Sequence, residues 1–161
     1  MHVRSWQAAY RGLLPQEYLD ALTPQRRLGE WEAVLGATCW PTTGTLVLED
    51  RAAGGGGVAG FACVGPTRDN DGDPASVGEL RLLYLDPDHF GTGGGTVLLA
   101  AAGDRLRAAG FVSATAWVLE TNDAARAFYE RRGWRPDGAR QRHDWGTFVV
   151  TDVRYAVVLG P

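Results

Sequence analysis

Apolar residues at the start of the chain recur at three- and four-residue intervals. Val3, Trp6 and Tyr10 fall on one face of a short helix, because a repeat of 3.6 residues brings such positions into line. Further apolar positions between residues 18 and 35 predict one or two more helices, with a break at Thr23-Pro24, since the residue before a proline is pushed out of the helical region. The chain is therefore expected to open with helices.

Beyond residue 42 the pattern becomes that of strands. Residues 45–49 and 58–64 are rich in apolar and β-branched side chains and flank the glycine run at residues 54–57, which predicts a hairpin. Residues 79–85 predict a third strand, which ends at Asp86-Pro87-Asp88 because proline cannot donate to a sheet ladder.

The second half of the chain alternates helices with strands. A glycine-rich segment leads directly into a helix that ends at Gly110, and residues 113–119 follow as a strand. Asn122 is suited to cap a helix that runs to Arg132 and ends at Gly133, and residues 134–142 and 148–159 predict two closing strands. We expect an α/β (α+β) fold in one domain over residues 1–161.

Composition and charge narrow the class of protein. Hydrophobic residues make up 45% and charged residues 22% of the 161 residues, which argues against a disordered or fibrous chain. A formal net charge of −3 is the wrong balance for a protein held mainly by nucleic-acid phosphates. No apolar run or signal-peptide core is evident, and Cys39 and Cys63 show no metal-type spacing. We expect a cytoplasmic protein without a metal, a nucleic-acid partner or a membrane partner.

The glycine loop at residues 91–95 directly precedes a helix. A helix N-terminus exposes unpaired N–H groups, so glycines there let an anion such as a phosphate approach closely. A tight turn without any ligand would use the same glycines. A Walker-type loop fits poorly because the chain contains no lysine, and a dinucleotide fold fits poorly because it would place its loop after the first strand.

Two segments together are more specific than the loop alone. They read Phe90-Gly91-Thr92-Gly93-Gly94-Gly95 and Asn122-Asp123-Ala124-Ala125-Arg126-Ala127-Phe128-Tyr129-Glu130-Arg131-Arg132-Gly133-Trp134. With them, and over most of its length, the chain resembles the GNAT superfamily of acetyl-CoA-dependent N-acetyltransferases. Their patterns are Gln/Arg-x-x-Gly-x-Gly/Ala and Asn-x-x-Ala-x-x-Phe-Tyr-x-x-x-Gly-Phe.

The chain departs from these patterns in two places. Phe90 replaces the polar first residue of the loop, and Thr92 stands where arginine or lysine is common, so backbone donors are expected to carry more of the pyrophosphate binding. The chain also starts inside its first predicted helix. We therefore expect the family's first strand to be missing from the sheet, or the chain to be truncated.

The resemblance implies a mixed, mostly antiparallel sheet flanked by helices, splayed between the strand ending near Leu85 and the strand starting near Ser113. In the family, the pantetheine arm of the cofactor enters this gap, and an N–H near Leu83 polarises the thioester carbonyl. The implied acetyl-CoA-binding residues are Leu83, Tyr84, Leu85, Phe90, Gly91, Thr92, Gly93, Gly94, Gly95, Thr96, Asn122, Ala125 and Tyr129.

The resemblance also implies catalytic roles. Glu79, eleven residues before Phe90, matches the position of a catalytic base, acting on the amine through water; a salt bridge with Arg81 is the alternative, and Glu120 is a competing base. Tyr129 matches the acid that protonates the coenzyme A thiolate, and a purely structural core aromatic is the alternative. Arg126, Arg131 and Arg132 are candidates for binding the adenosine phosphates, and the alternative is that they are solvated helix side chains.

The expected function is acetyl transfer from acetyl-CoA to a primary amine by direct attack in a ternary complex. A non-catalytic acyl-CoA-binding or sensory module and a nucleotide-binding fold are the alternatives. The acceptor, a small-molecule or a protein amine, stays open. Because a missing first strand would expose a sheet edge, a homodimer is a further expectation.

Overall fold

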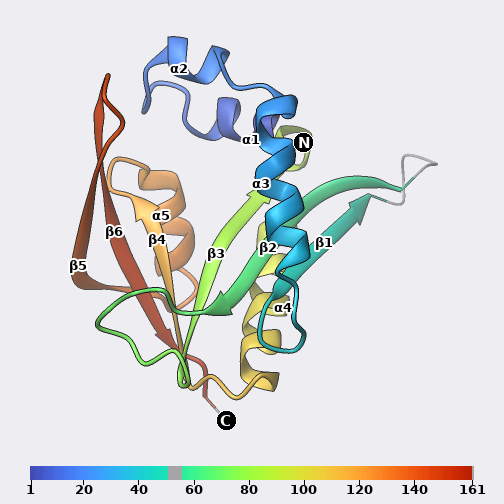
Figure 1. Cartoon of the computed structure of the whole chain (residues 1–161), viewed down its shortest axis with the longest axis vertical. Helices are drawn as coiled ribbons and strands as arrows, with labels where there is room; N and C mark the ends of the chain where they lie inside the picture. Colours follow the sequence, from blue (N-terminus) through green and yellow to red (C-terminus); the bar gives the residue numbers. More distant parts are fainter. Residues whose placement is uncertain (51–55, 161) are drawn as a thin grey trace.

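The computed structural model describes residues 1–50 and 56–160, which form a six-stranded sheet with helices on both faces (Figure 1). The strands lie in the order β1-β2-β3-β4-β6-β5. In the described ranges, β3 and β4 form the one parallel pair of neighbours. The elements are α1 (His2–Ala9), α2 (Gln16–Asp20), α3 (Pro24–Gly36), β1 (Gly44–Asp50), β2 (Gly57–Pro66), β3 (Val77–Leu85), the 3-10 turn η1 (Pro87–His89), α4 (Gly94–Ala108), β4 (Ser113–Leu119), α5 (Asp123–Glu130), β5 (Arg135–Asp144) and β6 (Val149–Val158).

The helix boundaries follow local chemistry that is visible in the sequence. The hydroxyl of Thr23 accepts a hydrogen bond from the Arg26 N–H at the start of α3, and the side chain of Asn122 accepts from the Ala125 N–H at the start of α5. Gly110 and Gly133 follow α4 and α5 with φ values of 93° and 86°, a conformation that glycine adopts without a steric penalty. The predicted break at Thr23 is confirmed, and Gly110 and Gly133 lie beyond their helices as predicted, whereas α5 ends at Glu130, short of the predicted Arg132.

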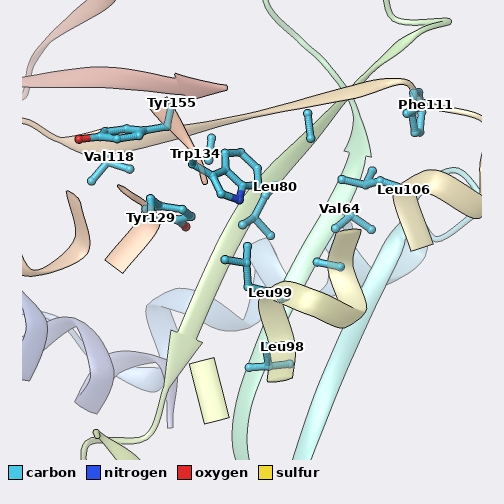
Figure 2. Packing of buried hydrophobic residues seen from close by; sticks show 14 residues of the cluster. Val64, Leu80, Leu98, Leu99, Leu106, Phe111, Val118, Tyr129, Trp134 and Tyr155 are labelled. Atoms are coloured by element: carbon cyan, nitrogen blue, oxygen red, sulfur yellow. The ribbon is translucent and has the colours of Figure 1, made fainter. Parts of the chain in front are cut away.

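Two apolar clusters lie on opposite faces of the sheet. On the face covered by α4 and α5, which we call the back, Leu98 and Leu106 pack against Val64 and Leu80 (Figure 2). On the other face, which we call the front, Leu14 and Leu19 from the α1–α2 region pack against Leu119 of β4 and Val150 of β6. Side chains alternate between these faces along each strand, so β4 and β6 contribute to both clusters.

The sheet parts between β3 and β4. These strands pair over three residues of each, ending at Glu79 opposite Thr115, and their continuations have no paired register. At the same point Arg81 forms a β-bulge, because Leu80 and Leu82 pair with the adjacent residues Val64 and Cys63 of β2. A bulge bends its strand and increases the local twist. The predicted splay is confirmed, and the bulge gives it a local cause.

The remaining expectations concern the ends of the sheet. The antiparallel pairing of β1 with β2 confirms the predicted hairpin strands, whereas residues 54 and 55 of the predicted glycine turn lie outside the described residues. The described chain opens with α1, and β1 is an edge strand. Within the described residues, no helix combines the length and apolar character needed to cross a membrane.

Candidate active site

A cleft of about 540 Å³ opens where β3 and β4 part. Its walls come from the main site elements, namely the diverging halves of β3 and β4, the glycine loop, α5 and the end of α1. The predicted cofactor residues among its lining are Leu83, Tyr84, Leu85, Phe90, Gly91, Gly93, Gly95, Thr96, Asn122, Ala125 and Tyr129. The structure therefore brings most of the predicted residues to one cleft.

The cleft reaches both faces of the sheet. Leu83 and Leu85 pack toward the back cluster, as does Phe128 of α5. Tyr84 points to the front, where its ring contacts those of Trp6 and Phe61, and Tyr10 lines the same mouth. A ligand between the strands on the back can thus meet a second ligand that arrives from the front.

The inner edge of β3 presents main-chain groups to the cleft. Asp86 donates its N–H to the carbonyl of Ala59, so alternate residues of β3 face β2, and those between them, Leu83 and Leu85, direct their N–H and C=O groups to the open side. Ser5 of α1 donates its hydroxyl to the Leu85 carbonyl at 2.6 Å. The N–H of Leu83 therefore faces the gap between β3 and β4, the position in which the family resemblance predicts a donor to the thioester carbonyl.

The glycine loop exposes a row of backbone donors. Gly91 and Gly93 have φ values of 76° and 91°, which turn the chain sharply from η1 into α4. Among the described residues, the amides of Gly91, Gly93, Gly94 and Gly95 have no hydrogen-bond acceptor, as expected for the start of a helix. These donors and the positive end of the α4 dipole together suit an anion.

The side chains of Phe90 and Thr92 contribute little to this anion site, and Gly94 has no side chain to contribute. Thr92 donates its hydroxyl back to the His89 carbonyl at 2.8 Å, and neither Thr92 nor Gly94 lines the cleft. A Cβ on Gly94 would lie 2.8 Å from a methyl of Leu48, so this glycine allows α4 to pack closely on β1. Phe90 lines the cleft but is 46% exposed.

Arg132 brings a positive charge to the glycine loop from the turn that follows α5. Its guanidinium hydrogen-bonds the hydroxyl of Thr96 and donates to the Phe128 carbonyl at 2.9 Å. The guanidinium carbon also lies 3.9 Å from the centre of the Phe128 ring. Arg132 and Arg131 both line the cleft, so the charge that the loop itself lacks is supplied by residues distant in sequence.

Tyr129 is buried at the centre of the cleft wall, with 8% of its surface exposed. Its ring packs against those of Phe128, Trp134 and Tyr155, and Figure 2 shows it beside Trp134 in the back cluster. Burial is the main cause that raises the pKa of its phenol, followed by the charge of Tyr10. The hydroxyl therefore keeps its proton at neutral pH and can donate it.

The structure does not bring Glu79 to the cleft. Its carboxylate is 2% exposed and accepts two hydrogen bonds from Arg68, at 2.6 and 2.9 Å, while Arg81 lies 3.7 Å away. Glu79 sits at the closed end of the splay, opposite Thr115, and is absent from the lining. Two hydrogen bonds from one guanidinium make a charge-assisted pair, so the geometry favours the salt-bridge alternative for Glu79, with Arg68 as the nearer partner.

The competing carboxylate and the remaining helix residues also have partners. Glu120 binds Arg140 at 2.7 Å, and its carbonyl accepts from Arg126, whose Nε also donates to Tyr155. Asn122 caps α5 and lines the cleft. Neither Glu120 nor Arg126 lines the cleft.

Sequence reasoning missed several residues of the site. Tyr84 was predicted, but the Arg68 partner of Glu79, the Arg81 bulge and the hydrogen bond between Tyr10 and Tyr84 were not, because all three depend on contacts between distant segments. The one signal available for Tyr10 was its place on the apolar face of α1, which marks burial but not a cleft.

Comparison with known proteins agrees with this geometry. A sequence model of the Acetyltransferase (GNAT) family matches residues 6–134. The Bacillus subtilis (strain 168) protein called Uncharacterized N-acetyltransferase YuaI is 32% identical over 130 residues, which cover 81% of this chain and 68% of that protein.

Solved structures share the fold. The PaiA N-acetyltransferase of Thermoplasma acidophilum, in complex with coenzyme A, is similar with a TM-score of 0.68 and 19% identity, over 97% of this chain and 87% of that one. YncA of Salmonella typhimurium, solved with its cofactor acetyl-CoA, is similar with a TM-score of 0.64 and 24% identity, over 87% and 76% of the two chains.

Proposed function

Because the chain belongs to the GNAT acetyltransferase family, we propose that it transfers the acetyl group of acetyl-CoA to a primary amine by direct attack in a ternary complex. The cleft that passes between β3 and β4 is the observation that carries this proposal. It offers a back groove for the cofactor and a front mouth for an acceptor, so both can be bound at once. The acceptor class, whether a small molecule or a protein amine, is part of what the experiment below determines.

Acetyl-CoA would be held largely by main-chain groups. The amides of residues 91 and 93–95 would bind the diphosphate, helped by Arg131 and Arg132, because an anion is stabilised at a helix N-terminus and beside guanidinium groups. The pantetheine arm would lie along the inner edge of β3, next to Asn122 and Ala125. When bound, the thioester supplies an acyl group that is activated toward amines.

The N–H of Leu83 would donate to the thioester carbonyl. A backbone donor aimed at the oxygen on which charge develops stabilises the tetrahedral intermediate. Tyr129 would donate its proton to the departing thiolate, since burial keeps its phenol protonated.

Transfer without an acyl-enzyme is supported by the two cysteines of the chain. Cys39 is exposed and Cys63 is buried, and neither lines the cleft. Burial raises the pKa of the Cys63 thiol, which lowers the fraction of nucleophilic thiolate. Direct attack by the amine is the simpler route.

The test is release of the coenzyme A thiol from acetyl-CoA with a panel of amines, including alkylamines, polyamines, amino acids and peptide N-termini. We expect thiol release with at least one class, together with the acetylated amine by mass spectrometry. Tyr129→Phe should lower kcat by at least about 100-fold and leave the Kd of coenzyme A unchanged. Acetyl-CoA binding without thiol release from any amine would replace this proposal with a non-catalytic acyl-CoA-binding module, and preference for ATP or NAD in a thermal-shift comparison would overturn both.

A further inference from the structure

Arg81 brings a positive charge to the front mouth of the cleft. It lies at the bulge of β3 and lines the cleft. On β2, Val64 belongs to the back cluster, so the next residue, Gly65, faces the front. A Cβ on Gly65 would lie 2.5 Å from Cζ of Arg81, which places the guanidinium against β2 at this glycine. The guanidinium is therefore on the front, the side from which an acceptor would arrive.

The charge of Arg81 has little compensation. Its Nη2 donates to the Pro66 carbonyl at 2.9 Å, while its Nε is buried and, within the described part of the chain, has no hydrogen-bond acceptor. Its one ion-pair partner among the described residues is Glu79, whose Oε2 lies 3.7 Å from Nε. Both oxygens of Glu79 already accept hydrogen bonds from Arg68. Two guanidinium groups thus share one carboxylate, and the group that lines the cleft is the one without a hydrogen bond to it.

Arg154 provides a contrast on the front of the sheet. Its guanidinium lies 3.0, 2.6 and 2.7 Å from the carboxylates of Asp69, Asp71 and Asp137, so its charge is offset. Arg81 is only 24% exposed, and none of the described residues that line the cleft carries a carboxylate. A cation that is largely buried without its own anion is costly. A ligand in the cleft can supply the anion.

The rest of the front mouth is apolar. Tyr10 and Tyr84 line it, and so does Trp117, which alternates along β4 with residues of the back cluster. The hydroxyls of Tyr10 and Tyr84 lie 3.1 Å apart and are hydrogen-bonded, and the indole N–H of Trp117 donates to Asp69 at 3.0 Å. Because these polar ends already have partners, the rings present apolar surface to the cleft.

We propose that the acceptor is an amino acid with an apolar side chain, and that Arg81 binds its carboxylate. This inference rests on the proposed acetyl transfer and names the class of its acceptor. A planar guanidinium forms paired, charge-assisted hydrogen bonds with a carboxylate. The apolar side chain would lie among Tyr10, Tyr84 and Trp117. Since Arg81 is two residues before Leu83, roughly 7 Å along the strand, an amino acid held there has its amine near the proposed donor to the thioester carbonyl.

The first test compares amino acids with the amines that remain when the carboxylate is removed. The pairs are leucine with isopentylamine and phenylalanine with phenethylamine. Hydrogen bonds between charged groups favour the bound state about 10- to 100-fold, so wild-type kcat/KM should favour the amino acid of each pair by that factor. Spermidine should be the poorest acceptor, because its additional ammonium groups would meet Arg81 and no carboxylate among the described lining residues.

Variants of Arg81 test whether this residue causes the preference. Arg81→Met removes the charge and keeps an apolar stem. It should lower kcat/KM for phenylalanine about 10- to 100-fold and change that for phenethylamine far less, so the preference disappears. Arg81→Lys should retain part of the preference, because the charge remains without the paired N–H groups. Arg140→Met is the matched control, because Arg140 binds Glu120 at the surface and lies outside the cleft lining.

Binding of hydrocinnamate provides a measurement that does not depend on turnover. This ligand has the phenyl group and the carboxylate but no amine, so it can occupy the site without reacting. Calorimetry on the coenzyme A complex should give a Kd that is about 10- to 100-fold higher for Arg81→Met than for wild type, and equal to wild type for Arg140→Met. The Kd of coenzyme A itself should be unchanged in both variants, which checks that each retains the fold.

The proposal is overturned if wild type uses the decarboxylated amines or spermidine as well as the amino acids, if Arg81→Met keeps the preference, or if Arg140→Met loses it. Should Arg81→Met fail to fold, the wild-type comparison within each pair still decides. Failure of acetyl transfer itself would appear differently, as wild-type protein that binds acetyl-CoA and releases no thiol with any amine. In that case the Kd of hydrocinnamate still decides whether Arg81 binds a carboxylate.

Discussion

Replacement of Arg132 by methionine tests the proposed binding of the cofactor phosphates, for which the glycine loop itself offers no lysine or arginine. The guanidinium of Arg132 reaches Thr96 at the start of α4 and stacks 3.9 Å from the Phe128 ring centre. Methionine keeps an apolar stem over that ring. Arg132→Met therefore removes the charge while retaining most of the packing.

The magnitude follows from the setting of the charge. A hydrogen bond to a charged group contributes about 1.5–3 kcal/mol, and Arg132 is partly exposed, so solvent screening reduces this to about 1–2 kcal/mol. That loss weakens coenzyme A binding about 5- to 30-fold. The effect should shrink at high salt, because screening weakens exposed charge interactions.

Isothermal titration calorimetry with acetyl-CoA and acetyl-pantetheine provides the assay. Acetyl-pantetheine lacks the diphosphate, so its Kd should be the same for Arg132→Met and wild type. Arg105→Met is the matched control, because Arg105 lies near the C-terminal end of α4, over Trp40 and outside the cleft lining. Equal losses with both ligands would show that Arg132 supports the fold, and no loss with acetyl-CoA would refute a role of Arg132 and leave the phosphates to the backbone amides and Arg131.

Two further predictions concern the glycine loop and α1. Gly95→Val should abolish coenzyme A binding, because its Cβ would lie 3.2 Å from the Phe128 ring and its methyl groups would extend into the cleft. Gly103→Ala on the same helix is the control, because its Cβ meets only the end of Arg107, at 3.7 Å, and it should raise the free energy of unfolding by about 0.5–1 kcal/mol. Calorimetry with coenzyme A tests the first variant and thermal unfolding tests the second. A Gly95→Val protein with normal affinity for coenzyme A would contradict the packing argument. Burial lowers the pKa of the His2 imidazole to about 4, so between pH 6.5 and 4 this imidazole is protonated in the unfolded chain more readily than in the folded one. The free energy of unfolding should therefore fall by about 1–2 kcal/mol as the pH is lowered through this range, a figure reduced for the partial exposure of His2 to solvent. His2→Phe should flatten the dependence of the unfolding free energy on pH, measured by urea unfolding. An unchanged pH dependence in this variant would refute the role of His2.

The parts of the fold that the sequence predicted are those with local causes. Thr23 and Asn122 cap helices through hydrogen bonds to residues three positions away, and Gly110 and Gly133 end helices through their own backbone conformation. Each of these features depends only on residues close in sequence. The glycine loop also depends only on neighbouring residues, which is why its position in front of α4 was predicted correctly.

The parts that could not be predicted depend on contacts between distant segments. Arg68 meets Glu79 across a turn whose path the sequence does not specify, and this contact holds the predicted base in a buried ion pair outside the cleft lining. Arg132 reaches Thr96 over a separation of 36 residues. Likewise the Arg81 bulge exists only in relation to β2, and no propensity of β3 alone indicates it.

The parting of β3 from β4 leaves backbone amides on facing edges without a strand to shield them, and this has a consequence for their hydrogen exchange. The N–H groups of Leu83 on β3 and, by the same alternation, Trp117 on β4 point into the gap. In ligand-free protein these amides should exchange with deuterium far faster than their neighbours in the same strands. A bound pantetheine chain would slow the exchange of these amides, because its own polar groups would hydrogen-bond to them. The cofactor would then bridge the separated ends of β3 and β4.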